Sequence, residues 1–308
     1  MKEKNDMKID EPQSENEWMI HALNIHGTFF EDWCEYILSQ SNHWELVDTK
    51  YPVEFPPTTG SKKAGQSELD VRGNLKIYDT VVESLIECKK NNPEFSNWIF
   101  FKKREQSPPF FRYLYSEKDN PINRIQHHLT VKKIDLIQLP ITDDAREVRG
   151  DYQGNKKGDK TKTANNSIWD SAYQVTLAMQ AIILEEARNF LNRPLGDMKK
   201  LFLPIILTTA NLMLATYDRQ IVNPLNGEIS WNNVEFEARD YLIYEYSIPT
   251  HLQYNPYVLS QIGGIIRPSF NDSIRQSEQI VRSPILIVQS GKFQEFLESI
   301  YESVKISL

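Results

Sequence analysis

The sequence predicts an α/β fold, in which helices flank a central mixed β-sheet. Apolar residues recur at helical spacing over residues 17–41 and again over residues 167–191. Between and after these helices lie runs rich in β-branched and aromatic residues, such as 81–89 and 201–210, which favour strands. With 308 residues and 40% hydrophobic content, the chain can bury a substantial core.

The N-terminal elements follow from composition and from helix and turn signals. Residues 1–16 are polar and are expected to form a disordered tail. The first helical pattern runs through residues 17–41, with a break near Gly27. A strand is expected to begin at residues 44–47, and the proline and glycine residues within 56–61 predict a loop.

A β-hairpin is expected next, because strand-like segments flank residues with turn chemistry. Residues 69–71 and 81–89 are the two expected strands. Between them, residues 73–74 (Gly-Asn) and 78–79 (Tyr-Asp) both offer a turn. This hairpin would form the centre of the sheet.

The remaining elements are predicted from the same patterns. Polar residues 142–166 are expected to be a long connection between the first strands and the second helix. Further strands are expected at residues 98–101, 110–115, 134–140, 201–210 and 283–288, a hairpin within 231–248, and a terminal helix at 293–306.

Charged residues are expected to converge at the end of the central hairpin. Side chains alternate along a strand, so Glu87 and Lys89 share one face while Ile86 and Cys88 point to the other. Pairing of the two strands would bring Asp70 beside Glu87. An ionised side chain in an otherwise apolar central strand is costly without a partner or a metal, so the pattern indicates a functional site.

These residues resemble the motif of the PD-(D/E)xK superfamily of restriction-like nucleases. In that family a helix leads into a mixed sheet with such a hairpin at its centre. The proline that precedes the first acid in the family is replaced here by Leu69, as in many members. Upstream, residues 27–31 (Gly-Thr-Phe-Phe-Glu) resemble the opening helix of Mrr-like members, in which the Glu faces the metal. The resemblance covers residues 26–101, and it implies that Glu31, Asp70, Glu87 and Lys89 are the catalytic residues.

The chemistry implied is metal-dependent hydrolysis of a phosphodiester. Mg²⁺ prefers carboxylates, carbonyls and water, and it can activate water and neutralise charge in the transition state. The expected ligands are Asp70, Glu87, the carbonyl of Cys88, and Glu31, which would bind directly, through water or to a second ion. Lys89 would orient or help to deprotonate the attacking water. Mn²⁺ is expected to substitute for Mg²⁺.

Structural roles compete with these assignments. Asp70 or Glu87 alone could be a surface acid, and Glu87 with Lys89 could form a salt bridge on an edge strand. Glu35 lies one turn beyond Glu31 on the same helix face and competes with it for the site. Glu68 is expected on the face opposite to Asp70.

An auxiliary residue is suggested on the second helix. In some branches of the superfamily, a Gln on the helix after the core strands touches the site, and Gln174 resembles that residue. The alternative is an exposed helix Gln without a role in the site.

Local basic clusters indicate a nucleic-acid partner, with DNA favoured over RNA. The formal net charge of −7 argues against coating of nucleic acid by bulk electrostatics, but affinity depends on the contacts actually made. Lysines at 132–133 and within 156–162 are equally well explained as solvated loop residues. The candidate contacts near the site are Lys62, Lys63, Lys90, Lys102, Lys103 and Arg104.

Other chemistries are less well supported. Cys34 and Cys88 are the only cysteines, and they are expected to be buried hydrophobes rather than a disulfide or a zinc site. The segment 60–65 lacks the spacing of a Walker phosphate loop and is interpreted as a mobile basic lip beside Asp70.

Two functions from different classes remain open. The first is a Mg²⁺-dependent endonuclease of restriction-like or antiphage-defence character, with residues 17–140 as its nuclease core. The second is a nuclease-fold subunit whose residues 141–308 bind a partner or regulator, with cleavage latent; otherwise these residues complete the same domain. No apolar run reaches the length of a membrane span, and the start lacks the apolar stretch of a signal peptide. A cytoplasmic protein is therefore expected, as a homodimer or as a subunit of a defence complex.

Overall fold

The computed structural model describes residues 15–55, 65–91, 95–104, 109–119, 124–134, 136, 139–148, 167–192, 199–249 and 282–308. The helices in these segments are α1 (Glu15–His26), α2 (Thr28–Ser39), α3 (Ser167–Asn192) and α7 (Phe293–Ser307), with short 3₁₀ helices η2 (Arg219–Ile221), η3 (Trp231–Asn233) and η4 (Ser290–Lys292). The strands are β1 (Trp44–Phe55), β2 (Gly65–Ile77), β3 (Thr80–Lys89), β4 (Asn97–Lys102), β5 (Phe110–Asp119), β6 (Arg124–Lys133), β7 (Ile141–Val148), β8 (Lys199–Thr208), β9 (Asn211–Tyr217), β10 (Val234–Arg239), β11 (Tyr241–Ser247) and β12 (Arg282–Gln289).

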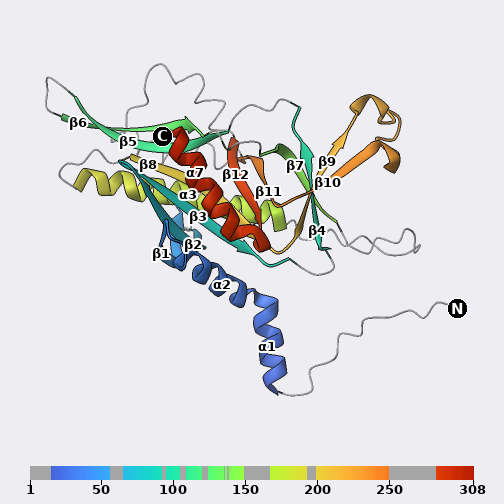
Figure 1. The fold of residues 1–308 in the computed structure, drawn as a ribbon, viewed down its shortest axis with the longest axis horizontal. Coiled ribbons are helices and arrows are strands. Elements are labelled where there is room, and N and C mark those ends of the chain that lie inside the picture. The colour runs from blue at the N-terminus through green and yellow to red at the C-terminus, as the bar shows by residue number, and fades with distance from the viewer. Residues whose placement is uncertain are drawn as a thin grey trace.

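The described strands form one 12-stranded mixed sheet (Figure 1). Its order is β1-β2-β3-β8-β12-β11-β7-β4-β9-β10. Outside this order, β5 pairs with β8, and β6 pairs with β5. The β2–β3 hairpin is antiparallel, whereas β3 and β8 run parallel over their whole length. The predicted α/β class with a central mixed sheet flanked by helices is therefore confirmed.

The two central strands are apolar because both of their faces are covered. Residues 82–88 of β3 are all buried, and so are residues 200–208 of β8. Parallel strands that are covered on both sides have continuous runs of apolar residues instead of an alternating pattern. This arrangement explains why both strands could be recognised in the sequence.

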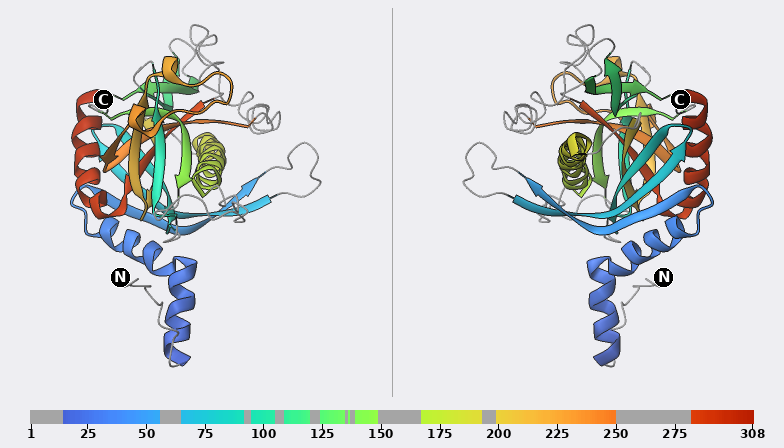
Figure 2. Two further views of the ribbon diagram at one scale, coloured as in Figure 1. Left: turned by 90° about the vertical axis from the view of Figure 1, so that its right-hand side faces the viewer. Right: turned by 90° about the vertical axis from the view of Figure 1, so that its left-hand side faces the viewer.

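Helices cover the sheet on two sides and divide the core into two layers (Figure 2). On one side α3 packs against Leu69, Leu85 and Phe202. On the other side α2 and α7 pack against residues that include Val71 and Ile86. We call these sides the α3 face and the α2/α7 face.

Gly27 separates α1 from α2, as the sequence predicted. Its φ of +80° lies in the left-handed region, which glycine adopts without the steric cost that a Cβ would bring. The amides of Phe30 and Glu31 both donate to its carbonyl at 2.8 and 3.2 Å, which starts α2. As a result α2 packs on the sheet while α1 projects away from it (Figures 1 and 2).

The hairpin turn forms at Tyr78 and Asp79, which is the second of the two turns expected from the sequence. Gly73, in the first, lies instead inside β2. A Cβ at Gly73 would lie 2.6 Å from Cδ2 of Leu38 and 2.8 Å from Oγ of Ser84. The glycine therefore allows α2 to approach the strand closely, and its role is packing, not a turn.

The prediction of a strand at residues 134–140 is wrong. Its described residues, 134, 136 and 139–140, lie outside any strand, and local hydrogen bonds join Leu136 to Ile134 and Leu139 to Leu136. The strand is β7, which begins at Ile141 within the expected polar connection. β7 lies between β4 and β11, so its backbone is paired on both sides although its sequence is polar.

The prediction of a hairpin within residues 231–248 is also wrong, because its two strands exist but do not pair with each other. β10 pairs with β9, and β11 pairs with β12 and β7. Only Asp240 lies between β10 and β11, which is too short for a hairpin connection. The local sequence pattern predicted both strands, but their pairing depends on strands that are distant in the sequence.

Other predicted elements agree with the structure within the described residues. The expected segments at 17–41, 44–47, 98–101, 110–115, 167–191, 201–210, 283–288 and 293–306 correspond to α1 and α2, β1, β4, β5, α3, β8, β12 and α7. The expected tail overlaps α1 at residues 15–16, and its residues 1–14 lie outside the described chain. The expected loop at 56–61 and the lysines within 156–162 also lie outside it.

Candidate active site

Asp70 and the end of β3 are joined by a direct hydrogen bond. The regular pairing of β2 with β3 stops at Val71 opposite Ile86. One residue further, the backbone N–H of Cys88 donates to Oδ2 of Asp70 at 2.6 Å. The carboxylate of Asp70 thus takes the place of a backbone acceptor, and the hairpin brings it beside Glu87 and Lys89 as expected.

The face of each residue on β3 also agrees with the prediction. Ile86 and Cys88 pack in the α2/α7 layer, whereas Leu85 packs in the α3 layer. Alternation along the strand then directs Glu87 and Lys89 toward the α3 face. The alternative of an edge-strand salt bridge does not hold, because β3 is paired on both sides and the described residues include no Glu87–Lys89 ion pair.

Burial makes both acids weak. It raises the pKa of Asp70 to about 7, against the lowering effect of the hydrogen bond from Cys88; the charge of Glu31 raises it further. Burial, and then the charge of Asp70, raises the pKa of Glu87 well above its usual value. Glu87 is only 6% exposed, and its Oε2 has no hydrogen-bond partner among the described residues. The positive charge of Lys89 lowers the pKa of both acids, but by less than burial raises it.

Glu31, and not Glu35, is the helix acid whose charge acts on this pair. The negative charge of Glu31 raises the pKa of both Asp70 and Glu87. The pKa of Glu35 is raised mainly by burial, and the neighbours that act on it are on α2 and β1. Glu31 is itself paired with Lys50, whose Nζ lies 3.8 Å from its Oε2. The sequence interpretation missed Lys50, because nothing in the pattern of β1 marks it.

The donors at the hairpin end suit a hard divalent cation. No set of three or more His, Cys, Asp or Glu side chains within the described residues is arranged to hold a metal ion. Mg²⁺, however, commonly takes only one or two protein carboxylates and completes its shell with carbonyls and water. Asp70 and the unpartnered Oε2 of Glu87 fit this requirement. The carbonyl of Cys88 leaves the strand on the same side as its N–H, toward Asp70.

The candidate nucleic-acid contacts differ in their surroundings: some have protein partners and others are exposed. Lys62 and Lys63 lie outside the described residues. Lys90 donates to the carbonyl of Asn24, and Lys103 is paired with Glu245 at 2.5 Å, so both of these lysines have protein partners. Lys102 and Arg104 are exposed.

The auxiliary position on α3 is not joined to the acids. Gln174 is half-buried, and within the described chain no hydrogen bond joins it to Asp70, Glu87 or Lys89. The N-terminus of α3 is instead fixed by Glu147, whose Oε1 accepts from the N–H of Ile168 at 2.9 Å. Glu147 lies in β7, in the segment expected to be a loop, so no sequence signal could have identified it.

The two cysteines are free and buried, as expected. The hydrogen bond with Cys34, and then burial, raises the pKa of the Cys88 thiol well above its usual value. A protonated thiol is neither a good nucleophile nor a metal ligand. Cys88 therefore contributes to the site through its backbone.

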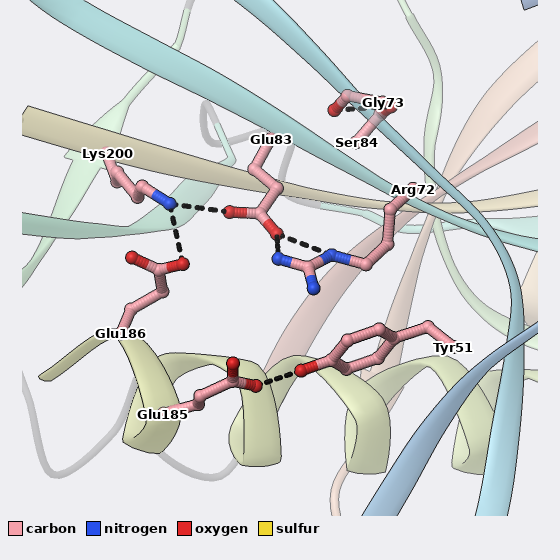
Figure 3. Close-up of polar contacts among 8 residues, drawn as sticks. All are labelled: Tyr51, Arg72, Gly73, Glu83, Ser84, Glu185, Glu186 and Lys200. Atoms are coloured by element: carbon pink, nitrogen blue, oxygen red, sulfur yellow. Dashed lines mark hydrogen bonds and ion pairs between the residues drawn. The ribbon is translucent and has the colours of Figure 1, made fainter. Parts of the chain in front are cut away.

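A second charged cluster lies on the same side of β3 (Figure 3). Glu83, which is fully buried, accepts from Nη2 of Arg72 at 2.5 Å and pairs with Nζ of Lys200 at 3.3 Å. Lys200 also pairs with Glu186 on α3 at 2.8 Å. Tyr51, whose ring lies under the Arg72 guanidinium, donates to Glu185. This cluster, which the sequence interpretation missed, links β1, β2, β3 and β8 to α3.

Comparisons with known proteins identify no relative of this chain. No family model, curated protein or solved structure matches the chain. None of the helices in the described segments has the length and apolar character needed to cross a membrane.

Proposed function

We propose that the protein is a Mg²⁺-dependent endonuclease that hydrolyses phosphodiester bonds in DNA. The observation that carries the proposal is the buried carboxylate of Glu87, which lies beside Asp70 and has an unpartnered oxygen. A buried acid without an ion-pair partner is costly in a core strand, and such perturbed groups are concentrated at functional sites. A divalent cation would offset that cost.

The residues of the site divide the work of hydrolysis. A bound Mg²⁺ would supply an activated water and charge neutralisation at the phosphate. The Cys88 amide holds the carboxylate of Asp70 in place. Glu87 supplies the second acid from β3, which is held by hydrogen bonds to β2 on one side and to β8 on the other. Lys89, as an ammonium, would orient the attacking water and offset the negative charge that develops in the transition state.

The order of the elements supports a restriction-like core. α2 leads into β1, β2 and β3, and β8 follows α3 and runs parallel to β3. This agrees with the helix and mixed sheet of the PD-(D/E)xK superfamily, in which the hairpin acids and the lysine act together. In the same interpretation, Glu31 on α2 would hold the metal directly or through water.

Plasmid nicking by the purified protein tests the proposal. The wild type is expected to nick DNA in Mg²⁺ or Mn²⁺ but not in EDTA. Asp70→Asn and Lys89→Met should each lower the rate on the order of 10²-fold or more, because each removes a group that acts on the reacting water. Glu68→Gln is the matched control, since Glu68 is exposed and adjacent to Asp70. Undiminished cleavage in both site variants would contradict the proposal.

Metal binding can be measured without cleavage. Mg²⁺ at about 100 times its Kd should raise the free energy of unfolding by about 2.7 kcal/mol. Differential scanning fluorimetry would detect this as a higher melting temperature. Glu87→Gln should abolish the shift, because the amide cannot serve as an anionic ligand. Equal shifts in both proteins would place the metal elsewhere.

A second candidate function is a nuclease-fold subunit of a larger complex. It is favoured by the apolar side chains that α1 exposes, namely Met19, Ile20 and Leu23, which are 42–53% exposed on a helix that projects from the sheet. A surface of this kind suits a protein partner. A wild type that is folded and binds Mg²⁺ but does not cleave alone would favour this function.

A further inference from the structure

Lys50 has an unusual backbone conformation in the middle of a strand. Its φ is +51°, in the left-handed region that is unfavourable for residues with a Cβ. Among the described residues, the other non-glycine residue with positive φ is Tyr78, which lies in the tight turn between β2 and β3. Positive φ is usual in such turns. β1 continues on both sides of Lys50, so a turn does not explain its conformation.

The irregularity of β1 at Lys50 coincides with that of β2 at Asp70. Thr49 pairs with Val71 and Tyr51 pairs with Leu69, which leaves Lys50 opposite Asp70 without a regular pair. Leu69 and Val71 should share one side of the sheet, yet they pack in the α3 layer and the α2/α7 layer respectively. Both strands therefore change face at the same point. This change frees the Asp70 carboxylate to bind the amide of Cys88.

The backbone geometry alone does not require a lysine at this position. Glycine or asparagine would adopt a left-handed conformation more easily. A lysine therefore adds strain at a position where smaller residues would fit. Conformations of this kind are concentrated at functional sites, where the side chain has a use that offsets the strain.

The ammonium group of Lys50 lies next to Glu31 and remains accessible. Its Nζ is 3.8 Å from Oε2 of Glu31, and its side chain is 48% exposed. Lys90, another described lysine of the candidate site, donates instead to the carbonyl of Asn24 on α1. At 3.8 Å the pairing with Glu31 is loose, so Lys50 could exchange that partner for another anion.

We propose that Lys50 binds a DNA phosphate adjacent to the one that is cleaved. The proposal rests on the proposed function and assigns it a substrate contact from β1. A lysine ammonium is a compact point charge, which suits a contact with one phosphate oxygen. On binding, Lys50 would pass from Glu31 to the phosphate, and Glu31 would become available to the metal side of the site.

The test measures binding of a labelled DNA duplex, with Ca²⁺ replacing Mg²⁺ so that cleavage does not interfere. Lys50→Asn removes the charge and tolerates the left-handed backbone. It should weaken binding roughly threefold to tenfold and reduce the slope of log K against log salt by about 0.9, as expected for one lost phosphate contact. Its melting temperature should equal or exceed that of the wild type. Lys50→Arg should retain the affinity and the slope.

Tyr78→Asn is the control for backbone strain, because it relaxes the other left-handed residue far from a phosphate contact. It should change neither the affinity nor the salt slope. If Lys50→Asn keeps the wild-type slope in a protein that cleaves DNA through Asp70, the inference about Lys50 is wrong and the proposed function stands. A wild type that neither binds nor cleaves DNA with any of these metals would overturn both.

Discussion

Glu83 and Glu87 lie on one face of the same strand, yet their surroundings differ. Glu83 is fully buried, and both of its oxygens have cationic partners, Arg72 and Lys200. Glu87 is nearly as buried, but its Oε2 has no partner in the described chain and its nearest charged neighbours include the acid Asp70. The same residue type thus serves as a structural link in one place and keeps an oxygen without a hydrogen-bond partner in the other.

The difference shows how to separate structure from function in a buried acid. A buried charge that is paired on all sides fixes the elements that it joins, here the hairpin, β8 and α3. A buried charge without a partner reduces stability, and groups of this kind are concentrated at functional sites. The sequence around the two glutamates does not distinguish them, because both lie in the same apolar strand.

The largest expected effect is on the paired acid. Glu83→Gln should lower the free energy of unfolding by about 3–5 kcal/mol, because it leaves the buried Arg72 charge without its partner. Urea unfolding followed by tryptophan fluorescence would measure this. Glu87→Gln is the matched control on the same strand, and it should leave the free energy of unfolding unchanged or raise it. A larger loss from Glu87→Gln than from Glu83→Gln would reverse the assignment of the two acids.

A smaller effect is expected from pH in the metal-free protein. Burial raises the pKa of Asp70 from 3.8 to about 7, so the native state holds this proton more tightly than the unfolded state. The stability from this group is fully present below pH 3.8 and is lost as the pH rises to about 7. Each pKa unit corresponds to about 1.4 kcal/mol.

The measurement compares the pH dependence of unfolding in EDTA for the wild type and for Asp70→Asn. The wild type should lose stability relative to the variant between pH 4 and 7, because only the wild type gains a charge at this site. The loss should be smaller than that of Glu83→Gln, since Asp70 is partly exposed and solvent screens its charge. Parallel curves for the two proteins would show that the carboxylate is not buried in solution. Added Mg²⁺ should reduce the difference above pH 7.

The smallest effect is expected at the rim of the paired cluster. Tyr51→Phe removes the hydroxyl that donates to Glu185 and keeps the ring beneath Arg72. The loss should be about 1 kcal/mol, the usual contribution of one hydrogen bond at an accessible acceptor. DNA cleavage should not change, since none of the hydrogen bonds and ion pairs described for this cluster reaches Asp70 or Glu87. A loss of cleavage with unchanged stability would show that the cluster belongs to the active site.

Patterns along the chain predicted the helices, strands and turns that depend on neighbouring residues in the sequence. The break at Gly27, the turn at Tyr78 and the burial of β3 follow from glycine geometry, turn chemistry and apolar runs. β7 was missed because its side chains are polar and its stability comes from pairing on both sides. Lys50 and Glu147 were missed for a related reason, since their importance arises from residues distant in the sequence.

By itself, the sequence determined that the chain forms an α/β sheet and that Asp70, Glu87 and Lys89 meet at the end of one hairpin, because alternation and turn chemistry act over short distances. The tertiary structure decided which acids are compensated. Glu83 meets Arg72 across the hairpin, Lys200 from β8 and, through it, Glu186 from α3, whereas Glu87 meets Asp70. The cost of a buried charge depends on what surrounds it in space, and these neighbours come from distant parts of the chain.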